Sequence, residues 1–269
     1  MAFQSASADF LVSDFFLALI ILGGYNGARM KYGILGDIHG NIEALEAVLD
    51  VMAKEGCRKY ISVGDLVGYG ASPHECIKRV RDLNTVVVAG NHDLAAIDRL
   101  NIDFFNTFAK ESAIWTRNTL VEEEKEFIAG LKLVEHVDSF TVVHSTLYSP
   151  ELFEYIQTSY DAHISFELQE RPLVFVGHSH IPVNFIRRRT GSFNMDPQVK
   201  VDPTCKTMVN VGSIGQPRDE NPNAVCAIYD SVEQIVRISR VKYDIAGAMK
   251  RIVDAGLPDI LAERLKFGR

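Results

Sequence analysis

Residues 32–41 read YGILGDIHGN, and this stretch decides the fold class. Its first four residues form an apolar run that is typical of a buried strand. The chain then turns polar and places Asp37 and His39 directly behind that strand. Residues two apart in an extended chain point to the same side, so we expect both side chains to aim at one point.

The same arrangement repeats along the chain. Apolar residues between 42 and 52 recur at helical spacing, and strand-like runs follow at residues 60–63 and 86–89. Residues 103–130 have a helical composition, whereas the chain beyond them is rich in strand-like runs. An amphipathic stretch at residues 245–265 closes the sequence. Strands that alternate with helices predict an α/β fold.

Polar residues capable of metal binding or acid–base chemistry follow these strand runs. They are Asp37, His39, Asp65, Asn91, His92, His144, His178 and His180. Open α/β proteins place their ligand sites at the ends of sheet strands. The spacing of His178 and His180, like that of Asp37 and His39, predicts that both side chains aim at one point. The tetrad Gly-Asn-His-Asp at residues 90–93 is expected by chance only about 0.002 times in a chain of this composition. In this order and at these places, the residues indicate one functional site.

The set offers two carboxylates, one amide oxygen and four imidazoles as metal ligands. Mixed nitrogen and oxygen ligands without thiolate suit manganese, iron, zinc, cobalt or nickel rather than calcium or an iron–sulfur cluster. So many ligands exceed the needs of one tetrahedral ion but suit two ions that share a bridging group. Two ions about 3.5–4 Å apart can clamp the attacking and leaving oxygens of a phosphoryl displacement.

The overall charge indicates which kinds of ligand the protein can bind. The chain has 35 acidic and 28 basic residues, a formal net charge of −7. This balance argues against a protein that holds nucleic acid on a broad basic face, but it permits a phosphate ester whose charge is met by local metal ions. The four cysteines form no C-x-x-C motif and indicate a reducing compartment, so we expect a cytoplasmic protein.

Residues 1–29 differ from the rest of the chain. An apolar run at residues 15–24 is too short for a membrane span of about 20 residues, and no Lys or Arg precedes it as in a secretory signal. The segment could be a translated extension upstream of the true start, a membrane-associating stretch or an extra packed helix. We favour an extension outside the core, with Met30 as the start. Residues 30–269 then form one domain with a helical insert at about 98–130, and we expect no membrane span.

The order D-x-H, G-D, G-N-H-D, H and G-H-x-H, from Asp37 to His180, resembles the calcineurin-like metallophosphoesterase superfamily. Residues 210–219 (NVGSIGQPRD), with Trp115 and Thr116, are similar to small bacterial phosphodiesterases grouped with diadenosine-tetraphosphatase-like proteins. The resemblance implies a four-layer α/β/β/α sandwich of two mixed sheets, with a dimetal site at the strand ends. It also implies two divalent transition-metal ions, with manganese the first expectation and iron, zinc, cobalt or nickel as alternatives.

The resemblance further implies a role for each residue. The first ion would be held by Asp37, His39 and His180. The second ion would be held by Asn91, His144 and His178. Asp65 would bridge the two ions, and His92 would stand beside them as general acid.

The implied activity is hydrolysis of a small phosphodiester or nucleotide-like phosphoanhydride, by attack of a hydroxide that bridges the ions. Arg218 and Tyr69 are expected to contact the substrate, Arg218 because a guanidinium pairs well with phosphate oxygens. Protein phosphatases of this superfamily read G-D-x-V-D-R-G at the second motif, where this chain has Gly68 and Tyr69. The Asp that orients their catalytic histidine is thus missing, although Asp93 could take its place beside His92.

Two alternative functions stay open at this point. One is a phosphomonoesterase or a protein phosphatase, and the departure at Gly68 and Tyr69 disfavours the protein phosphatase. The other is a catalytically silent metal-binding scaffold of the same fold, although every ligand position and His92 are filled. We expect a small phosphate ester or nucleotide as partner and no stable nucleic-acid partner. The sequence makes no prediction of the oligomeric state.

Overall fold

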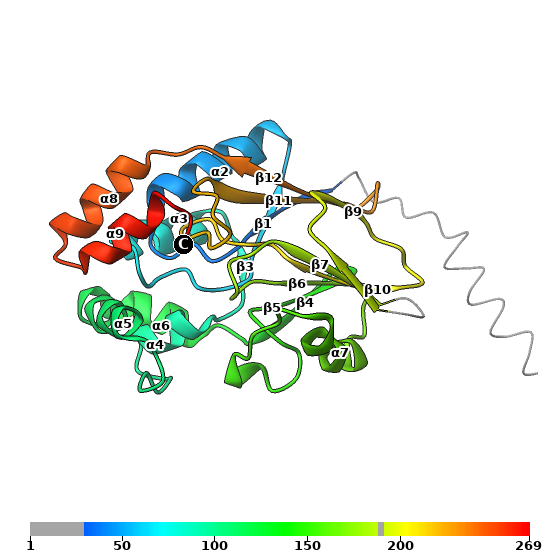
Figure 1. Ribbon diagram of the computed structural model, residues 1–269, viewed down its shortest axis with the longest axis horizontal. Coiled ribbons are helices and arrows are strands. Elements are labelled where there is room, and N and C mark those ends of the chain that lie inside the picture. The colour runs from blue at the N-terminus through cyan, green and yellow to red at the C-terminus, as the bar shows by residue number, and fades with distance from the viewer. Residues whose placement is uncertain (1–29, 188–190) are drawn as a thin grey trace, which may run out of the picture.

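Two mixed sheets of six strands each form the centre of the protein (Figure 1). The computed structural model describes residues 30–187 and 191–269. The first sheet has the strand order β3 (Val86–Val87), β2 (Lys59–Ser62), β1 (Lys31–Leu35), β11 (Ala224–Asp230), β12 (Ile235–Val241) and β9 (Gln198–Lys200). The second sheet has the order β4 (Val134–Val137), β5 (Phe140–Val143), β6 (Leu173–Val176), β10 (Lys206–Asn210), β7 (Val183–Arg187) and β8 (Gly191–Asn194).

Parallel pairing aligns the strands that precede the predicted site residues. In the first sheet, β1 runs parallel to β2, and β2 runs parallel to β3. In the second sheet, β5 and β10 both run parallel to β6. Because the carboxyl ends of parallel strands meet at one edge of a sheet, the loops behind these strands gather at the same edge.

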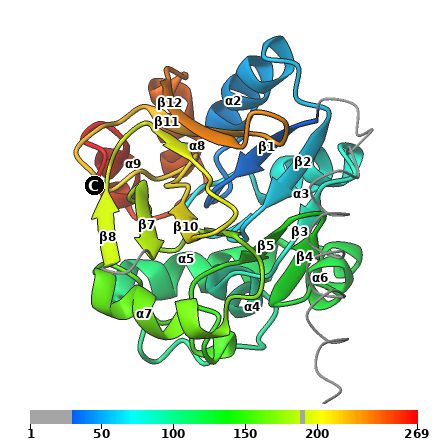
Figure 2. The same cartoon turned by 90° about the vertical axis from the view of Figure 1, so that its right-hand side faces the viewer.

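Helices cover the outer face of each sheet and complete four layers (Figure 2). α2 (Ile42–Lys54) and α3 (Pro73–Asp82) pack on the first sheet, and α8 (Ile245–Asp254) and α9 (Asp259–Leu265) continue this layer. On the second sheet, α7 (Ser159–Leu168) packs against β7 and β8. The remaining helices are α4 (Asn91–Ala96), α5 (Thr107–Thr119), α6 (Glu122–Ala129) and the short 3-10 helix at Pro150–Leu152. The predicted α/β/β/α sandwich is confirmed.

Aromatic side chains fill the space between the two sheets. Phe140 lies at the centre of this cluster, with ring centroids 5.2 Å from Tyr32, 5.3 Å from Phe175 and 5.7 Å from Tyr229, each in edge-to-face contact. Edge-to-face pairs add to the free energy of apolar burial because the positive ring edge meets the negative ring face. The contacts join β1 and β11 of one sheet to β5 and β6 of the other, so they hold the two sheets against each other.

The structure adds α3, α4, β4, β8 and β9 to the sequence-based elements, and it differs from them at β3 and α7. The third strand, expected at residues 86–89, is the two-residue β3, and Val88 forms only an isolated bridge to Lys132. The helix α7 was not expected within a strand-rich region. Its Thr158 caps the helix by accepting a hydrogen bond from the backbone N–H of Asp161, and only one short apolar stripe faces the sheet. A periodicity this weak gives little signal in the sequence.

The remaining sequence-based expectations concern the helical insert, residues 1–29 and membrane-spanning helices. The predicted helical insert at about 98–130 contains α5 and α6. Residues 1–29, predicted to be an extension outside the core, lie outside the described residues. Among the described residues, no helix is both long and apolar enough to cross a bilayer.

The inter-sheet cluster predicts a large effect of truncating Phe140, whose side chain is fully buried. Phe140→Ala should lower the free energy of unfolding by about 3–5 kcal/mol, the usual cost of such a cavity. Urea denaturation followed by circular dichroism measures this difference. Phe267→Ala is the control, because the Phe267 side chain is 60% exposed. Equal stability of the two variants would contradict the central role of this cluster.

Candidate metal centre

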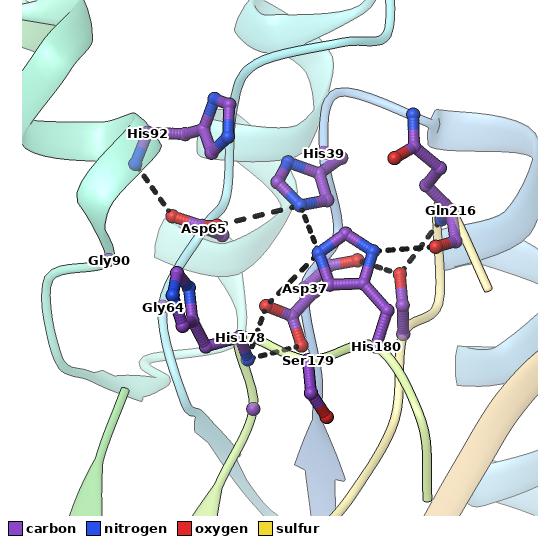
Figure 3. Close-up of polar contacts among 12 residues, drawn as sticks. Asp37, His39, Gly64, Asp65, Gly90, His92, His178, Ser179, His180 and Gln216 are labelled. Atoms are coloured by element: carbon purple, nitrogen blue, oxygen red, sulfur yellow. Dashed lines mark hydrogen bonds and ion pairs between the residues drawn. The ribbon is translucent and has the colours of Figure 1, made fainter. Parts of the chain in front are cut away.

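The loops behind the parallel strands bring the predicted residues together. Figure 3 shows six of the side chains, which are Asp37, His39, Asp65, His92, His178 and His180. Asp37 and His39 follow β1, and Asp65 follows β2. The other members follow β3, β5 and β6, and they are Asn91, His144, His178 and His180. All seven side chains are buried. The structure therefore brings residues from two sheets to one buried place. The position of these residues directly after the strands predicted this arrangement.

The backbone at this point is left-handed rather than extended. The φ angles of Asp37, His39, Asp65, His178 and His180 lie between 30° and 67°. A residue with a β-carbon in this region is strained by about 1–3 kcal/mol, so the surrounding structure must hold it in place. The expected reason for the convergence of Asp37 and His39, an extended chain, is therefore wrong. A tight turn brings the two side chains together instead.

The first group consists of Asp37, His39, Asp65 and His180, whose candidate ligand atoms lie within 4.8 Å of one another. His39 donates Nδ1–H to the carbonyl of Val67, and His180 donates Nδ1–H to the carbonyl of Gln216. A carbonyl only accepts, so in both neutral rings Nε2 carries a lone pair. These two Nε2 atoms face each other at 3.0 Å. Two lone pairs at this distance repel unless a cation lies between them.

The second group consists of Asp65, His144 and His178. His144 donates Nδ1–H to the carbonyl of Val63, which leaves its Nε2 as a lone-pair donor to a metal. That Nε2 lies 3.2 Å from Nδ1 of His178 and 3.2 Å from Oδ1 of Asn91. Asn91 therefore lies where the fourth ligand of this group is expected.

His178 and His180 separate between the two groups. Their spacing predicted that both would aim at one point, and this expectation is wrong. The left-handed backbone at both residues turns one ring toward His144 and the other toward His39. The division agrees with the ligand sets that the family resemblance implied.

Asp65 is common to both groups. Its Oδ2 lies 3.5 Å from Nε2 of His39 and 3.4 Å from Nε2 of His144, and it has no hydrogen-bond partner among the described residues. Its Oδ1 accepts a hydrogen bond from the backbone N–H of His92. An unpartnered carboxylate oxygen is costly when buried. Its position between two sets of imidazoles is the one that a bridging ligand takes.

The electrostatics of the site favour cations. Burial lowers the pKa values of His39 and His180 well below their ordinary range, so both rings are neutral, which is the form that ligates metals. Burial alone would also lower the pKa of His144, but the carboxylate of Asp65 raises it to about 9. Burial and the charge of Asp65 raise the pKa of Asp37 to about 7. Burial is the main cause of the shift at Asp37. The negative charges of Asp65 and Asp37 cause the shift at His144, whose Nε2 proton a metal ion would replace.

The donor set therefore fits two divalent ions. The opposed lone pairs of His39 and His180 and the unpartnered oxygen of Asp65 favour positive charge at this place. Imidazole, carboxylate and amide ligands suit transition-metal ions, and no thiolate lies in either group. Manganese, iron, zinc, cobalt and nickel all meet this description.

His92 lies beside the two groups. Its ring contacts those of Tyr69 and His39, with centroids 4.4 and 5.0 Å away, and its Nδ1 has no hydrogen-bond partner among the described residues. Asp93 does not orient it. Both carboxylate oxygens of Asp93 accept from backbone N–H groups, of Leu66, Val67 and Gly90. Burial lowers the pKa of His92 to about 4, so its ring is neutral at pH 7.

Gly68 explains why the Asp of the protein phosphatases has no place here. Its φ angle is +89°, and a β-carbon on it would lie 2.6 Å from Nδ1 of His92. The ring of His92 occupies the space that a side chain at position 68 would need. The next residue, Tyr69, packs its ring on His39, and its ring lies 5.5 Å from the guanidinium of Arg218.

Arg218 lies at the edge of the first group. Its guanidinium donates to Oε1 of Gln216, whose backbone carbonyl holds His180. Its charge also contributes to the low pKa of His180, after burial. The sequence did not single out Gln216 for a role, although it lies within the stretch at residues 210–219 that carried the subfamily resemblance.

A pocket of about 450 Å³ opens beside the second group. Tyr69, Asn91, His92 and His178 form its inner end. Its outer walls come from the helical insert and from residues near 150, and they include Phe104, Phe105 and Tyr155. The sequence did not predict these aromatic residues as part of the site, because two segments far apart in the chain must meet to form the pocket.

Comparison with known proteins agrees with this geometry. Residues 30–233 match the model of the calcineurin-like phosphoesterase superfamily domain. An uncharacterized protein of Methanocaldococcus jannaschii is 37% identical over 246 residues, covering 90% of this chain and 99% of that protein. The crystal structure of a metallophosphoesterase from Sphaerobacter thermophilus matches with a TM-score of 0.78 and 35% identity, covering 90% of this chain and 100% of that chain. The phosphodiesterase YfcE of Escherichia coli strain K12 is 22% identical over 220 residues, covering 78% of this chain and 93% of that protein.

The two groups predict which ligand variants lose which ion. His180→Asn should weaken binding of one ion, and Asp65→Asn should weaken both, because Asp65 alone belongs to both groups. Elemental analysis after equilibrium dialysis measures the metal content of each variant. His163→Asn is the control, because its side chain is 61% exposed. Two tightly held ions in Asp65→Asn would contradict the bridging role.

The close approach at Gly68 predicts a selective defect. Gly68→Ala should displace the His92 ring and leave the metal content unchanged. If His92 acts in acid–base catalysis, kcat should fall by about tenfold or more. Steady-state kinetics and elemental analysis on one sample test both statements. Gly130→Ala is the matched control, because a β-carbon there meets its nearest atom at an ordinary 3.5 Å. Equal kcat in both variants would count against the role of this packing.

Proposed function

Because the chain belongs to the calcineurin-like phosphoesterase superfamily, we propose that it hydrolyses small phosphodiesters at a centre of two divalent metal ions. Membership in this family makes it a hydrolase of phosphoric esters. The observation that carries the proposal is the Asp65 carboxylate, which is shared between two buried histidine groups. A relative named a phosphodiesterase, YfcE of Escherichia coli, supports a diester as the substrate class.

The ligand residues have separate tasks in this proposal. Asp37, His39 and His180 hold the first ion, and Asn91, His144 and His178 hold the second, with Asp65 between them. Hydrogen bonds from Nδ1 to backbone carbonyls fix the rings of His39, His144 and His180 in the tautomer that presents Nε2. When bound, the two ions supply a hydroxide at neutral pH and positive charge against the phosphoryl oxygens.

His92 is the residue that we propose as the general acid. It lines the pocket next to the ligand groups, and it is held through its backbone N–H by Asp65. From there it would transfer a proton to the departing oxygen of the ester. Arg218 would bind a phosphate oxygen, and Tyr69 would hold Arg218 and His92 in position through its ring contacts.

A nucleotide-like phosphoanhydride is the second candidate substrate, because the same centre and the same acid would serve it. A phosphomonoesterase or protein phosphatase is less well supported, since Gly68 leaves no carboxylate to orient His92. A silent scaffold is disfavoured because all seven ligand positions and His92 are filled by competent side chains. We further propose that residues 30–269 act as one domain in the cytoplasm, which agrees with the free thiols of Cys57, Cys76, Cys205 and Cys226.

The first test is hydrolysis by manganese-loaded protein, with the metal content confirmed in the same sample. Turnover of bis(4-nitrophenyl) phosphate would support the diester proposal. Product analysis with diadenosine tetraphosphate would test the phosphoanhydride as a substrate. Two molecules of ADP would indicate symmetrical cleavage, whereas AMP together with ATP would indicate attack at another phosphate. Absence of turnover of both substrates by fully loaded protein would contradict the proposed function.

The role of His92 predicts an effect that depends on the departing group. His92→Ala should lower kcat by about 10²–10⁴-fold for an alkyl ester, whose alkoxide needs a proton to depart. The loss should be much smaller for a 4-nitrophenyl ester, because 4-nitrophenolate departs unprotonated. Comparing the two substrates with wild type and variant at equal metal content measures this difference. Equal losses for both substrates would show that His92 acts in another way.

A further inference from the structure

The pocket beside the metal centre has walls of unusual composition. Beyond the metal ligands and His92, its lining residues include Tyr69, Phe104, Phe105, Glu151, Phe153 and Tyr155. Most are aromatic or apolar. Since the pocket ends at His92, a group that occupies it lies next to the residue proposed to protonate the departing oxygen. The pocket is therefore placed to receive the departing half of a substrate.

Aromatic rings line the pocket at two depths. Phe105 lies within the pocket, with its ring centroid 5.1 Å from that of His92. Tyr155 stacks on His178 with centroids 4.1 Å apart and planes at 24°, although half of its surface is exposed. Phe104 is 93% exposed at the outer end. A large, solvent-exposed aromatic side chain beside the metal centre indicates a surface that binds an apolar group.

The charge of the pocket excludes one class of departing group. None of its lining residues is Lys or Arg, and Glu151 is the only carboxylate among them. A polyphosphate chain needs cationic partners in its site. At this end of the site it would meet the carboxylate of Glu151 and no cationic side chain among the lining residues.

We propose that this pocket binds the departing group of the substrate and that this group is an uncharged planar ring system, such as a nucleoside. The proposal rests on the proposed phosphodiester hydrolysis and names its substrate class, a nucleoside phosphodiester. Stacking on Phe104, Phe105 and Tyr155 supplies the binding free energy, and Glu151 disfavours departing groups that carry phosphate. Diesters are thereby preferred over dinucleoside polyphosphates at one and the same metal centre.

Binding of adenosine tests the pocket without any hydrolysis. Adenosine is titrated into the full-length, manganese-loaded protein by isothermal calorimetry. Phe104→Ala should weaken adenosine binding by roughly tenfold, since stacking of a base on one aromatic ring contributes about 1–3 kcal/mol. Phe104 is the residue of choice because a side chain this exposed contributes little to the stability of the fold. Phe193→Ala is the matched control, with a ring that is 59% exposed outside the pocket.

Reversing the charge of Glu151 tests whether the pocket disfavours departing groups that carry phosphate. Glu151→Lys should raise the ratio of kcat/KM for diadenosine tetraphosphate to kcat/KM for bis(4-nitrophenyl) phosphate by roughly fivefold, as a reversed charge near the surface does for a charged ligand. An unchanged or lower ratio would overturn the charge argument. Failure of adenosine to bind, or equal binding by wild type and Phe104→Ala, would overturn the proposed pocket. Normal adenosine binding without turnover of either ester would instead refute the proposed hydrolysis and leave the pocket assignment standing.

Discussion

The carboxylate of Asp65 lies between two sets of imidazoles, with one oxygen that no hydrogen bond satisfies. Burying a charge in this way is costly unless opposite charge comes with it. The nearby rings of His39 and His180 are neutral and turn lone pairs toward the same region. The folded chain therefore favours the binding of cations at two neighbouring points. Because bound cations stabilise the folded state, the same ions contribute to stability and to the proposed phosphate chemistry.

Small residues let the polypeptide reach this arrangement. A β-carbon on Gly90 would lie 2.1 Å from Oδ1 of Asp65, and one on Gly177 would lie 2.6 Å from Oδ2 of Asp37. Both glycines stand directly before a ligand residue, Asn91 and His178 respectively. Close packing of the loops against the carboxylates thus explains why the ligand motifs begin with glycine. It also explains how two sheets with different strand orders contribute to one compact site.

The sequence predicted the parts of this protein that depend on local pattern. Polar residues behind parallel strands can only gather at a sheet edge, so the positions of Asp37 and Asp65 followed from the strand pattern alone. The separation of His178 from His180 did not follow, because it depends on left-handed backbone angles that the surrounding loops impose. The aromatic pocket could not be predicted from the sequence for a different reason. Phe104 belongs to the insert, and it meets the segment near residue 150 only in the folded chain.

The surroundings of His92 connect its packing to the proposed reaction. Gly68 admits the ring, and Asp93 is occupied by backbone N–H groups, so no carboxylate holds a proton on it. Burial is the main cause of its low pKa, and the positive charge of Arg218 adds to the effect. Bound metal ions would lower this pKa further, and a bound phosphodiester anion would raise it, because like charge disfavours and opposite charge favours the protonated ring. Proton transfer from His92 in the proposed reaction therefore depends on the negative charge that the substrate brings to the site.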